Sequence, residues 1–346
     1  MWRVGSHAYR ANVAFETAVD MADRDNNWRE KTVATGEDLR GLLVPVVLPM
    51  TPGGGPDLDN LRELVASLLA AGAEGIWVNG STGEVHDLNP AERATVVGEV
   101  ATVVDGRGPV VAHVGDTSTK LAAAHAEAAA AAGATHIGAV APYYASFDPD
   151  EVGTYYEELA KASSVPLLVY NLPQMVKYRL EPETVVDLAR RGLAVGVKDT
   201  AGDFTWYRTL LQRMDTEGVP FRFFMGVESL VDVSLFAGGH GAVCTLANLA
   251  PRTFVALCAA AARQDWAEVR THQRDVVSLV QALRVPGRTD WIASIAALKW
   301  VMSELGTLTS ATIASPVRPL NAAEQQHLAE HALPLAARLA ATGSDG

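Results

Sequence analysis

Short apolar runs alternate with longer amphipathic stretches along most of this chain. The runs are rich in Val, Leu, Ile and Ala, a composition typical of strands buried on both faces of a parallel sheet. Eight such runs are present, at residues 42–48, 75–79, 109–113, 136–141, 166–170, 194–198, 221–225 and 241–245. The pattern therefore predicts eight strands, each of which leads into a helix.

The amphipathic stretches predict helices at residues 58–71, 90–104, 118–132, 149–162, 182–191, 203–214, 228–237 and 251–263. The second of these has a clear start signal, because Asn89-Pro90 with Glu92 combines an N-cap, a proline in the first turn and a capping-box acid. The fourth repeats this signal. Eight strands each followed by a helix predict an α/β fold, a (β/α)8 TIM barrel, which we place at residues 39–263.

Two segments fall outside this alternation. Residues 1–38 are polar and lack the strand pattern, so we interpret them as a short N-terminal extension. Residues 264–346 contain three helical patterns without a strand signal, at 265–284, 290–305 and 321–341. They predict a C-terminal region of three helices packed on the barrel.

Composition and charge narrow the class of protein. The 346 residues are 49% hydrophobic and 20% charged, which is enough apolar surface for a large core. The formal net charge of −12 offers no basic surface for nucleic acid. The two cysteines have neither metal nor disulfide spacing, and no apolar segment is long enough to span a membrane. We therefore expect a cytoplasmic protein without a bound metal.

Lysine is scarce, which makes one position conspicuous. The chain has six lysines among its 28 basic residues, and only Lys198 ends an apolar barrel strand. In such barrels the chemistry lies at the C-terminal ends of the strands. An apolar surrounding favours the neutral amine, which can attack a carbonyl group to form a Schiff base. The alternative is a structural lysine paired with Asp199 or another carboxylate.

Two other strand ends carry groups that complement such a lysine. Tyr170 ends the neighbouring predicted strand, where its hydroxyl is within reach of a group on Lys198 and can transfer protons. The segment 80–84 follows the second strand, and the hydroxyls of Ser81 and Thr82 on a turning backbone suit a carboxylate. Each feature has a structural alternative, a core tyrosine and an ordinary loop, so their combination is what favours a catalytic site.

These residues belong to a set of motifs in a fixed order along the chain. The motifs are Gly80-Ser81-Thr82-Gly83-Glu84, Pro142-Tyr143-Tyr144, Tyr170-Asn171-Leu172-Pro173, Gly196-Val197-Lys198-Asp199 and Gly238-Gly239-His240-Gly241. With them, residues 39–340 resemble the dihydrodipicolinate synthase/N-acetylneuraminate lyase family of class I, Schiff-base pyruvate-dependent aldolases. The resemblance implies a lyase that binds a 2-oxo acid covalently, reacts it with or releases an aldehyde, and requires no metal or other cofactor.

The resemblance also implies roles for individual residues. Lys198 matches the lysine that forms the iminium, and Tyr170 matches the tyrosine that relays protons. Ser81 and Thr82 match the pair that binds the pyruvyl carboxylate and joins the relay. Tyr144 matches a tyrosine that enters the neighbouring subunit's site in many tetrameric members, so a homo-oligomer, either a tetramer or a dimer, is expected.

Further positions bear on the substrate. Gly226 and Val243 match backbone positions that line the pocket. Members that make the lysine-pathway intermediate carry an arginine five residues after the tyrosine, where this chain has Met175, and a thioether cannot grip a carboxylate as a guanidinium does. We therefore do not expect an efficient dihydrodipicolinate synthase, unless Lys177 takes the arginine's place. Thr200 matches the position at which sialic-acid and sugar-acid members use a threonine hydroxyl, so the resemblance favours a hydroxylated 2-oxo acid. Met175 and the nearby Leu172 favour an apolar or aromatic acceptor instead.

Three functions are compatible with these residues. The first is a lyase that cleaves or joins pyruvate and an aldehyde through Lys198. The second is a dehydratase or deaminase that uses the same iminium to eliminate water or ammonia from a 2-oxo sugar or amino acid derivative. The third is a barrel that binds ligands without turnover, which the complete set of Lys198, Tyr170, Ser81 and Thr82 disfavours.

Overall fold

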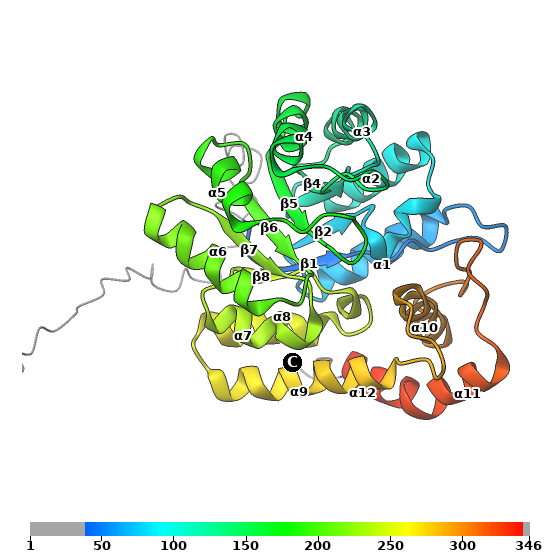
Figure 1. Cartoon of the computed structure of the whole chain (residues 1–346). Helices are drawn as coiled ribbons and strands as arrows, with labels where there is room; N and C mark the ends of the chain where they lie inside the picture. The colour runs from blue at the N-terminus through cyan, green and yellow to red at the C-terminus, as the bar shows by residue number, and fades with distance from the viewer. Residues whose placement is uncertain (1–38, 342–346) are drawn as a thin grey trace, which may run out of the picture.

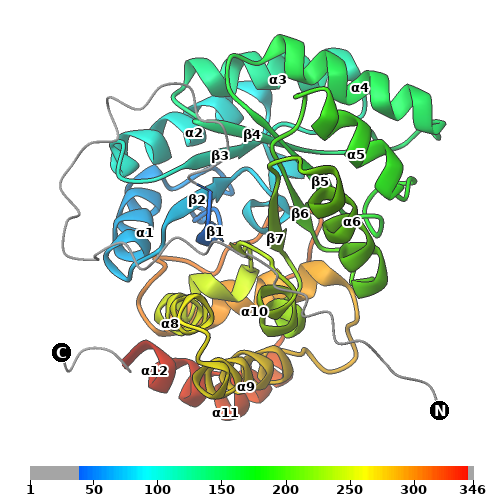
Figure 2. The same ribbon diagram turned by 90° about the vertical axis from the view of Figure 1, so that its left-hand side faces the viewer.

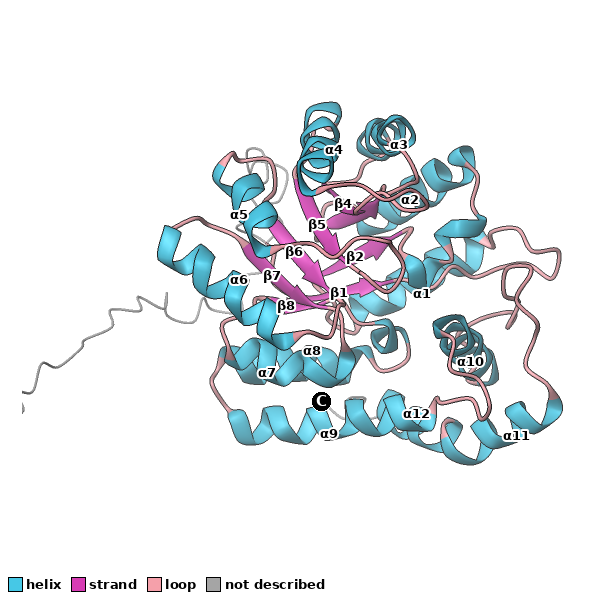
Figure 3. Ribbon diagram, in the orientation of Figure 1, coloured by secondary structure: helices cyan, strands magenta, loops and turns pink. Residues whose placement is uncertain are grey.

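Eight parallel strands form a closed barrel at the centre of the molecule (Figure 3). Each strand pairs with the next one along the chain, and the first closes the ring by pairing with the eighth. The strands are β1 (Gly41–Pro45), β2 (Gly75–Val78), β3 (Val110–His113), β4 (His136–Val140), β5 (Leu167–Asn171), β6 (Gly196–Asp199), β7 (Arg222–Met225) and β8 (Gly241–Ala242). The predicted (β/α)8 fold class is confirmed.

The structure is a computed structural model that describes residues 39–341, so the predicted N-terminal extension lies outside the described residues. Eight helices follow the strands and surround the barrel (Figure 1). They are α1 (Leu58–Ala70), α2 (Pro90–Val104), α3 (Thr119–Ala131), α4 (Pro149–Ala162), α5 (Pro182–Arg190), α6 (Phe204–Glu217), α7 (Val231–Phe236) and α8 (Pro251–Ala262).

The helix starts follow the predicted capping signals. In α2 the Asn89 side chain accepts hydrogen bonds from the backbone N–H groups of Ala91 and Glu92, and the Glu92 carboxylate accepts one from the Asn89 N–H. The same capping box is present at the start of α4. The predicted helix at 228–237 begins instead with a 3₁₀ turn, Glu228–Leu230, before α7.

The seam between β1 and β8 differs from the prediction. A Cβ atom on Gly241 would lie 2.0 Å from the carbonyl oxygen of Gly41, so only glycine fits where the two strands meet. β8 has two residues rather than the predicted five, because the chain turns into a 3₁₀ helix at Thr245–Asn248. The Asn248 Nδ2 then donates to the carbonyl oxygen of Pro45 at 2.8 Å, which replaces part of the missing strand pairing.

Up to residue 341, four helices follow the barrel, not the predicted three. They are α9 (Trp266–Ala282), α10 (Trp291–Glu304), α11 (Ala322–His331) and α12 (Leu333–Ala341). The third predicted pattern, 321–341, is divided at Ala332, because Pro334 has no N–H with which to continue the helical hydrogen bonds. Figures 1 and 2 show the four helices together on the side of the barrel where α8 lies. Among residues 39–341, no helix is long and apolar enough to cross a membrane.

Candidate active site

A cavity of about 230 Å³ lies at the C-terminal ends of the barrel strands. Its inner wall comes from β5, β6 and the loops after β2, β7 and β8, and its outer wall comes from α9, α10 and the segment between them. Eight of the nine predicted site residues line it, namely Ser81, Thr82, Tyr170, Met175, Lys198, Thr200, Gly226 and Val243. This is the end of the barrel at which enzymes of this fold carry out their chemistry.

Lys198 lies in the inner part of this cavity with only 4% of its surface exposed. Its Nζ lies 4.0 Å from the ring centroid of Tyr170 and 4.8 Å from the ring centroid of Trp77. None of the ion pairs within residues 39–341 includes Lys198. The amine is therefore not held by a carboxylate and lies against two aromatic rings.

Asp199 does not pair with the lysine beside it, because successive side chains of a strand point to opposite faces. Its Oδ1 accepts a hydrogen bond from the Asn171 Nδ2 at 2.7 Å and another from the Ala201 N–H at 3.4 Å. Burial raises the pKa of the Asp199 carboxyl to about 6. Within residues 39–341, Lys198 therefore does not form the structural ion pair with Asp199 that the sequence left as an alternative.

This raised pKa makes stability depend on pH. The folded value of about 6 exceeds the ordinary 3.8, so between these pH values the folded state keeps a proton that the unfolded state has lost. Stability therefore falls as the pH rises through this window. Asp199→Asn has no proton to lose at this position. Between pH 3.5 and pH 8, its free energy of unfolding should therefore rise relative to that of the wild type by up to about 3 kcal/mol. Urea unfolding of both proteins at the two pH values measures this gain; a constant difference would contradict it.

Tyr170 is directly opposite Lys198 in the parallel register of β5 and β6. Its ring packs edge-on against Trp77 at 5.7 Å and against His113 at 6.0 Å between ring centroids. Burial lowers the pKa of His113 to about 3, so this imidazole is neutral at physiological pH. Gly138 leaves the space for the indole, since a Cβ there would lie 2.5 Å from the Trp77 ring. Sequence reasoning missed this aromatic support, because it does not show which strand residues point inward together.

The loops after β2, β7 and β8 bring polar groups together. The Thr82 and Thr245 hydroxyl oxygens are 2.8 Å apart, and the Thr245 N–H donates to the Glu228 Oε1 at 2.9 Å. Burial raises the pKa of Glu228. Thr245 and Glu228 both line the cavity and were not predicted, although each lies just beyond a strand end, where the barrel rule locates functional residues.

Gly226 and Thr200 shape the inner cavity. A Cβ atom at Gly226 would lie 2.1 Å from the Thr200 Oγ1 and 3.2 Å from the Lys198 Cε, so a side chain there would fill the space beside the lysine. The Thr200 Oγ1 is buried without a hydrogen-bond partner among residues 39–341. This hydroxyl is consequently free to bond a substrate.

Tyr144 is the one predicted site residue that does not line the cavity. It is 83% exposed and has a positive φ of 81°. The Lys177 Nζ lies 5.8 Å from the Tyr144 ring centroid, and Lys177 does not line the cavity either. Lys177 therefore does not occupy the place of an arginine at Met175.

A buried ion pair fixes the loop that carries Ser81 and Thr82. Glu84 ends this loop in a left-handed conformation, with φ 52°, and its carboxylate pairs with Lys299 of α10, both side chains being 0% exposed. The Glu84 Oε2 also accepts a hydrogen bond from the Ala314 N–H at 2.8 Å. The loop is thus tied to the C-terminal helices.

The outer wall contains residues that sequence reasoning missed altogether. Its members from α9, α10 and the segment between them are Val280, Leu283, Arg284, Trp291, Ser294 and Ile295. They follow no barrel strand, so the strand-end rule does not select them. No group of three or more metal-ligating side chains capable of holding an ion was found within residues 39–341.

The fold and the site together define a barrel lyase of the class I aldolase type. The chain belongs to the Dihydrodipicolinate synthetase family, whose sequence model matches residues 38–333. The resemblance inferred from the motifs is thereby confirmed, and the chain is an enzyme of the lyase class.

Individual relatives carry different names. The probable 2-dehydro-3-deoxy-D-pentonate aldolase YjhH of Escherichia coli is 32% identical over 249 residues, covering 71% of this chain and 83% of that protein. The 4-hydroxy-tetrahydrodipicolinate synthase 1 of Streptomyces coelicolor is 32% identical over 285 residues, covering 82% and 89%. Among solved structures, YagE of Escherichia coli, in complex with pyruvate, has a TM-score of 0.80 at 25% identity and covers 87% of this chain and 99% of its own.

Proposed function

We propose that this enzyme forms a Schiff base between Lys198 and pyruvate or a related 2-oxo acid, and that it cleaves or joins this acid and an aldehyde. The observation that carries the proposal is the buried Lys198 amine, which has no carboxylate partner among residues 39–341 and lies 4.0 Å from the Tyr170 ring centroid in the main cavity. The aldolase name of YjhH and the pyruvate bound to YagE support the same reaction class.

The proposed chemistry uses the neutral form of the Lys198 amine as its nucleophile. The Lys198 Nζ attacks C2 of the 2-oxo acid, and loss of water from the carbinolamine leaves an iminium. This cation accepts the electron pair when a C3 proton leaves, which gives an enamine. Its C3 then forms a bond to the aldehyde carbon, the new alkoxide takes a proton, and water releases the product from Lys198. Cleavage is the same sequence in reverse, and no metal or other cofactor takes part.

The surrounding groups have distinct tasks in this proposal. Tyr170 transfers protons to and from the carbinolamine and the alkoxide. Ser81 and Thr82 bind the carboxylate of the 2-oxo acid through hydroxyl and backbone donors, and the Thr82 to Thr245 hydrogen bond extends the proton path. Thr200, whose hydroxyl is free, bonds an oxygen of the substrate chain.

The decisive experiment is borohydride reduction in the presence of a panel of 2-oxo acids. Reduction of the iminium adds a stable mass to the intact protein, and peptide mapping locates it. We expect attachment of pyruvate, or of another acid in the panel, on Lys198 alone. No adduct with any 2-oxo acid would overturn the proposal.

Tyr170→Phe should lower turnover by about 10²- to 10⁴-fold, the range expected for loss of a positioned proton donor. The phenyl ring keeps its packing against Trp77 and His113, so folding and Lys198 should be preserved and pyruvate should still be trapped. Steady-state kinetics and borohydride trapping measure the two effects. Unchanged turnover would remove the assigned role from Tyr170.

The absence of an arginine at Met175 supports an activity other than efficient dihydrodipicolinate synthesis. Met175 lines the cavity and is 38% exposed, so the acceptor meets a thioether at this position. We therefore expect condensation of pyruvate with aspartate semialdehyde to be slow or undetectable in steady-state kinetics, and reaction with other aldehydes to be faster.

A second function, dehydratase or deaminase, is favoured by one observation. Glu228 lines the cavity and burial raises its pKa, so it is suited to protonate a leaving hydroxyl or amine. Both functions use the Lys198 iminium. Product analysis separates them, because only aldol cleavage releases free pyruvate together with an aldehyde.

We place Tyr144 in the site of a neighbouring subunit of a cytoplasmic homo-oligomer. Its 83% exposed ring and positive φ support a contact made outside its own chain. Light scattering together with activity at the same protein concentration tests this; a fully active monomer would contradict it.

A further inference from the structure

The outer half of the cavity is mostly apolar. Val280 and Leu283 line it from the α9 side, Trp291 and Ile295 line it from α10, and Met175 lines it from the loop after β5. Leu283 and Ile295 are 3% exposed, whereas Trp291 is 36% exposed and so presents part of its ring to an incoming molecule. A surface of this kind gains free energy by covering an apolar body and leaves few partners for a chain of hydroxyls.

Among residues 39–341, only three charged side chains line the cavity, and they differ in the partners that they already have. Lys198 is the amine that carries the 2-oxo acid in the proposed function. The Glu228 carboxylate is occupied by the Thr245 N–H at 2.9 Å. Arg284 lines the outer half, and no ion pair within residues 39–341 includes it. A guanidinium remains protonated at all physiological pH values and has a planar set of donors that matches a carboxylate.

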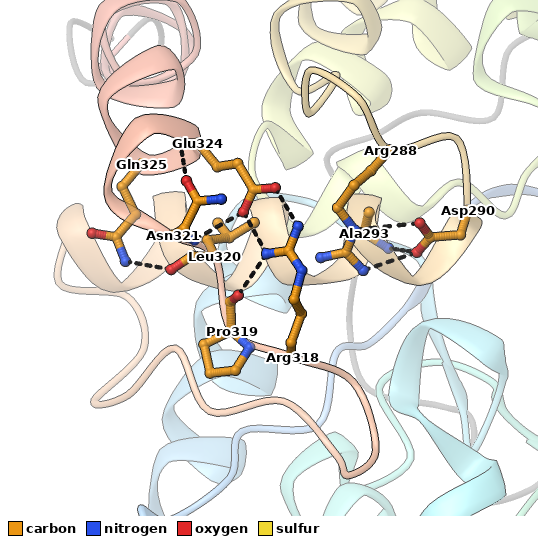
Figure 4. A network of polar contacts seen from close by, with 9 residues as sticks. All are labelled: Arg288, Asp290, Ala293, Arg318, Pro319, Leu320, Asn321, Glu324 and Gln325. Carbon is orange, nitrogen blue, oxygen red and sulfur yellow. Dashed lines mark hydrogen bonds and ion pairs between the residues drawn. The ribbon is translucent and has the colours of Figure 1, made fainter.

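The segment that carries Arg284 is held in place by a network of its own (Figure 4). Arg288 pairs with Asp290 at 3.0 Å, and the Asp290 carboxylate caps α10 by accepting from the Ala293 N–H at 2.9 Å. Leu283 and Val285, on either side of Arg284, are buried. Arg288 is therefore already paired, whereas the exposed Arg284 side chain lines the cavity without an ion-pair partner among the described residues and is available to a ligand.

We infer that Arg284 binds a carboxylate of the aldehyde substrate, and that the apolar outer wall covers the body of this aldehyde between its carboxylate and its reacting carbon. The inference rests on the proposed function, because it concerns the second substrate of the same site. An aldehyde with an ammonium group beside its carboxylate would meet apolar side chains on this wall. A polyol would likewise leave most of its hydroxyls unpaired there.

Matched aldehydes test this without knowledge of the natural substrate. The probes are 3- and 4-carboxybenzaldehyde and the corresponding carboxamides, which have nearly the same shape but no charge. Each is condensed with pyruvate by the wild type, Arg284→Gln and Arg284→Lys, and kcat/KM is measured. For each variant, kcat/KM for the carboxylate is divided by kcat/KM for the matching carboxamide. Comparing this ratio between variants removes the intrinsic reactivity of each aldehyde, which is the same for all of them.

For at least one ring position we expect the ratio to fall about 10- to 100-fold in Arg284→Gln, the loss typical of a charge-assisted hydrogen bond. Arg284→Lys should retain part of the preference, because it keeps the charge but loses the planar pair of donors. Arg274→Gln is the matched control, since it removes the same charge from an exposed arginine of α9 that does not line the cavity. Its ratio should equal that of the wild type.

Three results would overturn the inference. The carboxylate-to-carboxamide ratio could be the same in Arg284→Gln and the wild type at both ring positions, or it could fall equally in Arg274→Gln. The third result is that neither carboxybenzaldehyde reacts although a carboxamide does. Pyruvate trapping on the wild type is measured first with borohydride. Its absence would count against the proposed function, whereas trapping followed by an unchanged ratio would count only against the role of Arg284.

Discussion

Lys198→Met should abolish the borohydride-dependent attachment of pyruvate and lower turnover by about 10⁴-fold or more, the scale seen when a covalent nucleophile is removed. Methionine is unbranched and apolar, so it can fill the space beside Trp77 and Tyr170 while it removes the amine. Intact mass after reduction measures the first effect, and single-turnover kinetics measure the second.

Lys120→Met is the matched control for this variant. Lys120 is an exposed lysine of α3 and does not line the cavity. Its variant should trap pyruvate and turn over as the wild type does. Trapping that persists in Lys198→Met would show that another amine carries the substrate and would contradict the assignment.

Lys299→Met should lower the free energy of unfolding by about 3 to 5 kcal/mol, because it leaves the Glu84 carboxylate buried without its cation. Both side chains of this pair are 0% exposed. Lys299 also donates to the Thr312 carbonyl oxygen at 2.9 Å, so its loss unpairs a second group. Denaturant unfolding at constant protein concentration measures the change.

Two further variants show whether the buried charge is the cause. Glu84→Gln combined with Lys299→Met removes both charges and keeps an acceptor for the Ala314 N–H, so the double variant should be more stable than Lys299→Met alone. Arg338→Met breaks an ion pair near the surface, in which the Arg338 side chain is 53% exposed and the Asp275 side chain 27%. This variant should lower the free energy of unfolding by no more than about 1 kcal/mol. A double variant less stable than Lys299→Met would contradict this explanation.

The same pair links stability to the site. Glu84 ends the loop that holds Ser81 and Thr82, and Lys299 belongs to α10, which supplies Trp291 to the outer wall. In the folded fraction of Lys299→Met, the KM for the 2-oxo acid should rise more than kcat falls, since the loop is proposed to bind the carboxylate.

Much of the barrel could be predicted from the chain alone, because its signals are local. Each strand reads as an apolar run, and Asn89 and Asp148 mark helix starts within a few residues of the groups that they cap. One difference arises from a distant group, because Asn248 donates a hydrogen bond to β1 where β8 was expected to continue. The other is local, because Pro334 divides the last helical pattern into two helices.

The sequence by itself determined the fold class and the neighbouring positions of the two residues that we propose to react, Lys198 and Tyr170. An apolar run that ends in Lys198 and a neighbouring run that ends in Tyr170 place both side chains at one end of a parallel barrel, since adjacent strands run in register. Only the tertiary structure decided what surrounds this pair. The Trp77 ring needs the space at Gly138, Glu84 needs Lys299, and Arg284 reaches the cavity through the packing of α9 and α10. These contacts join residues far apart in the chain, and their formation depends on how whole elements pack rather than on any local pattern.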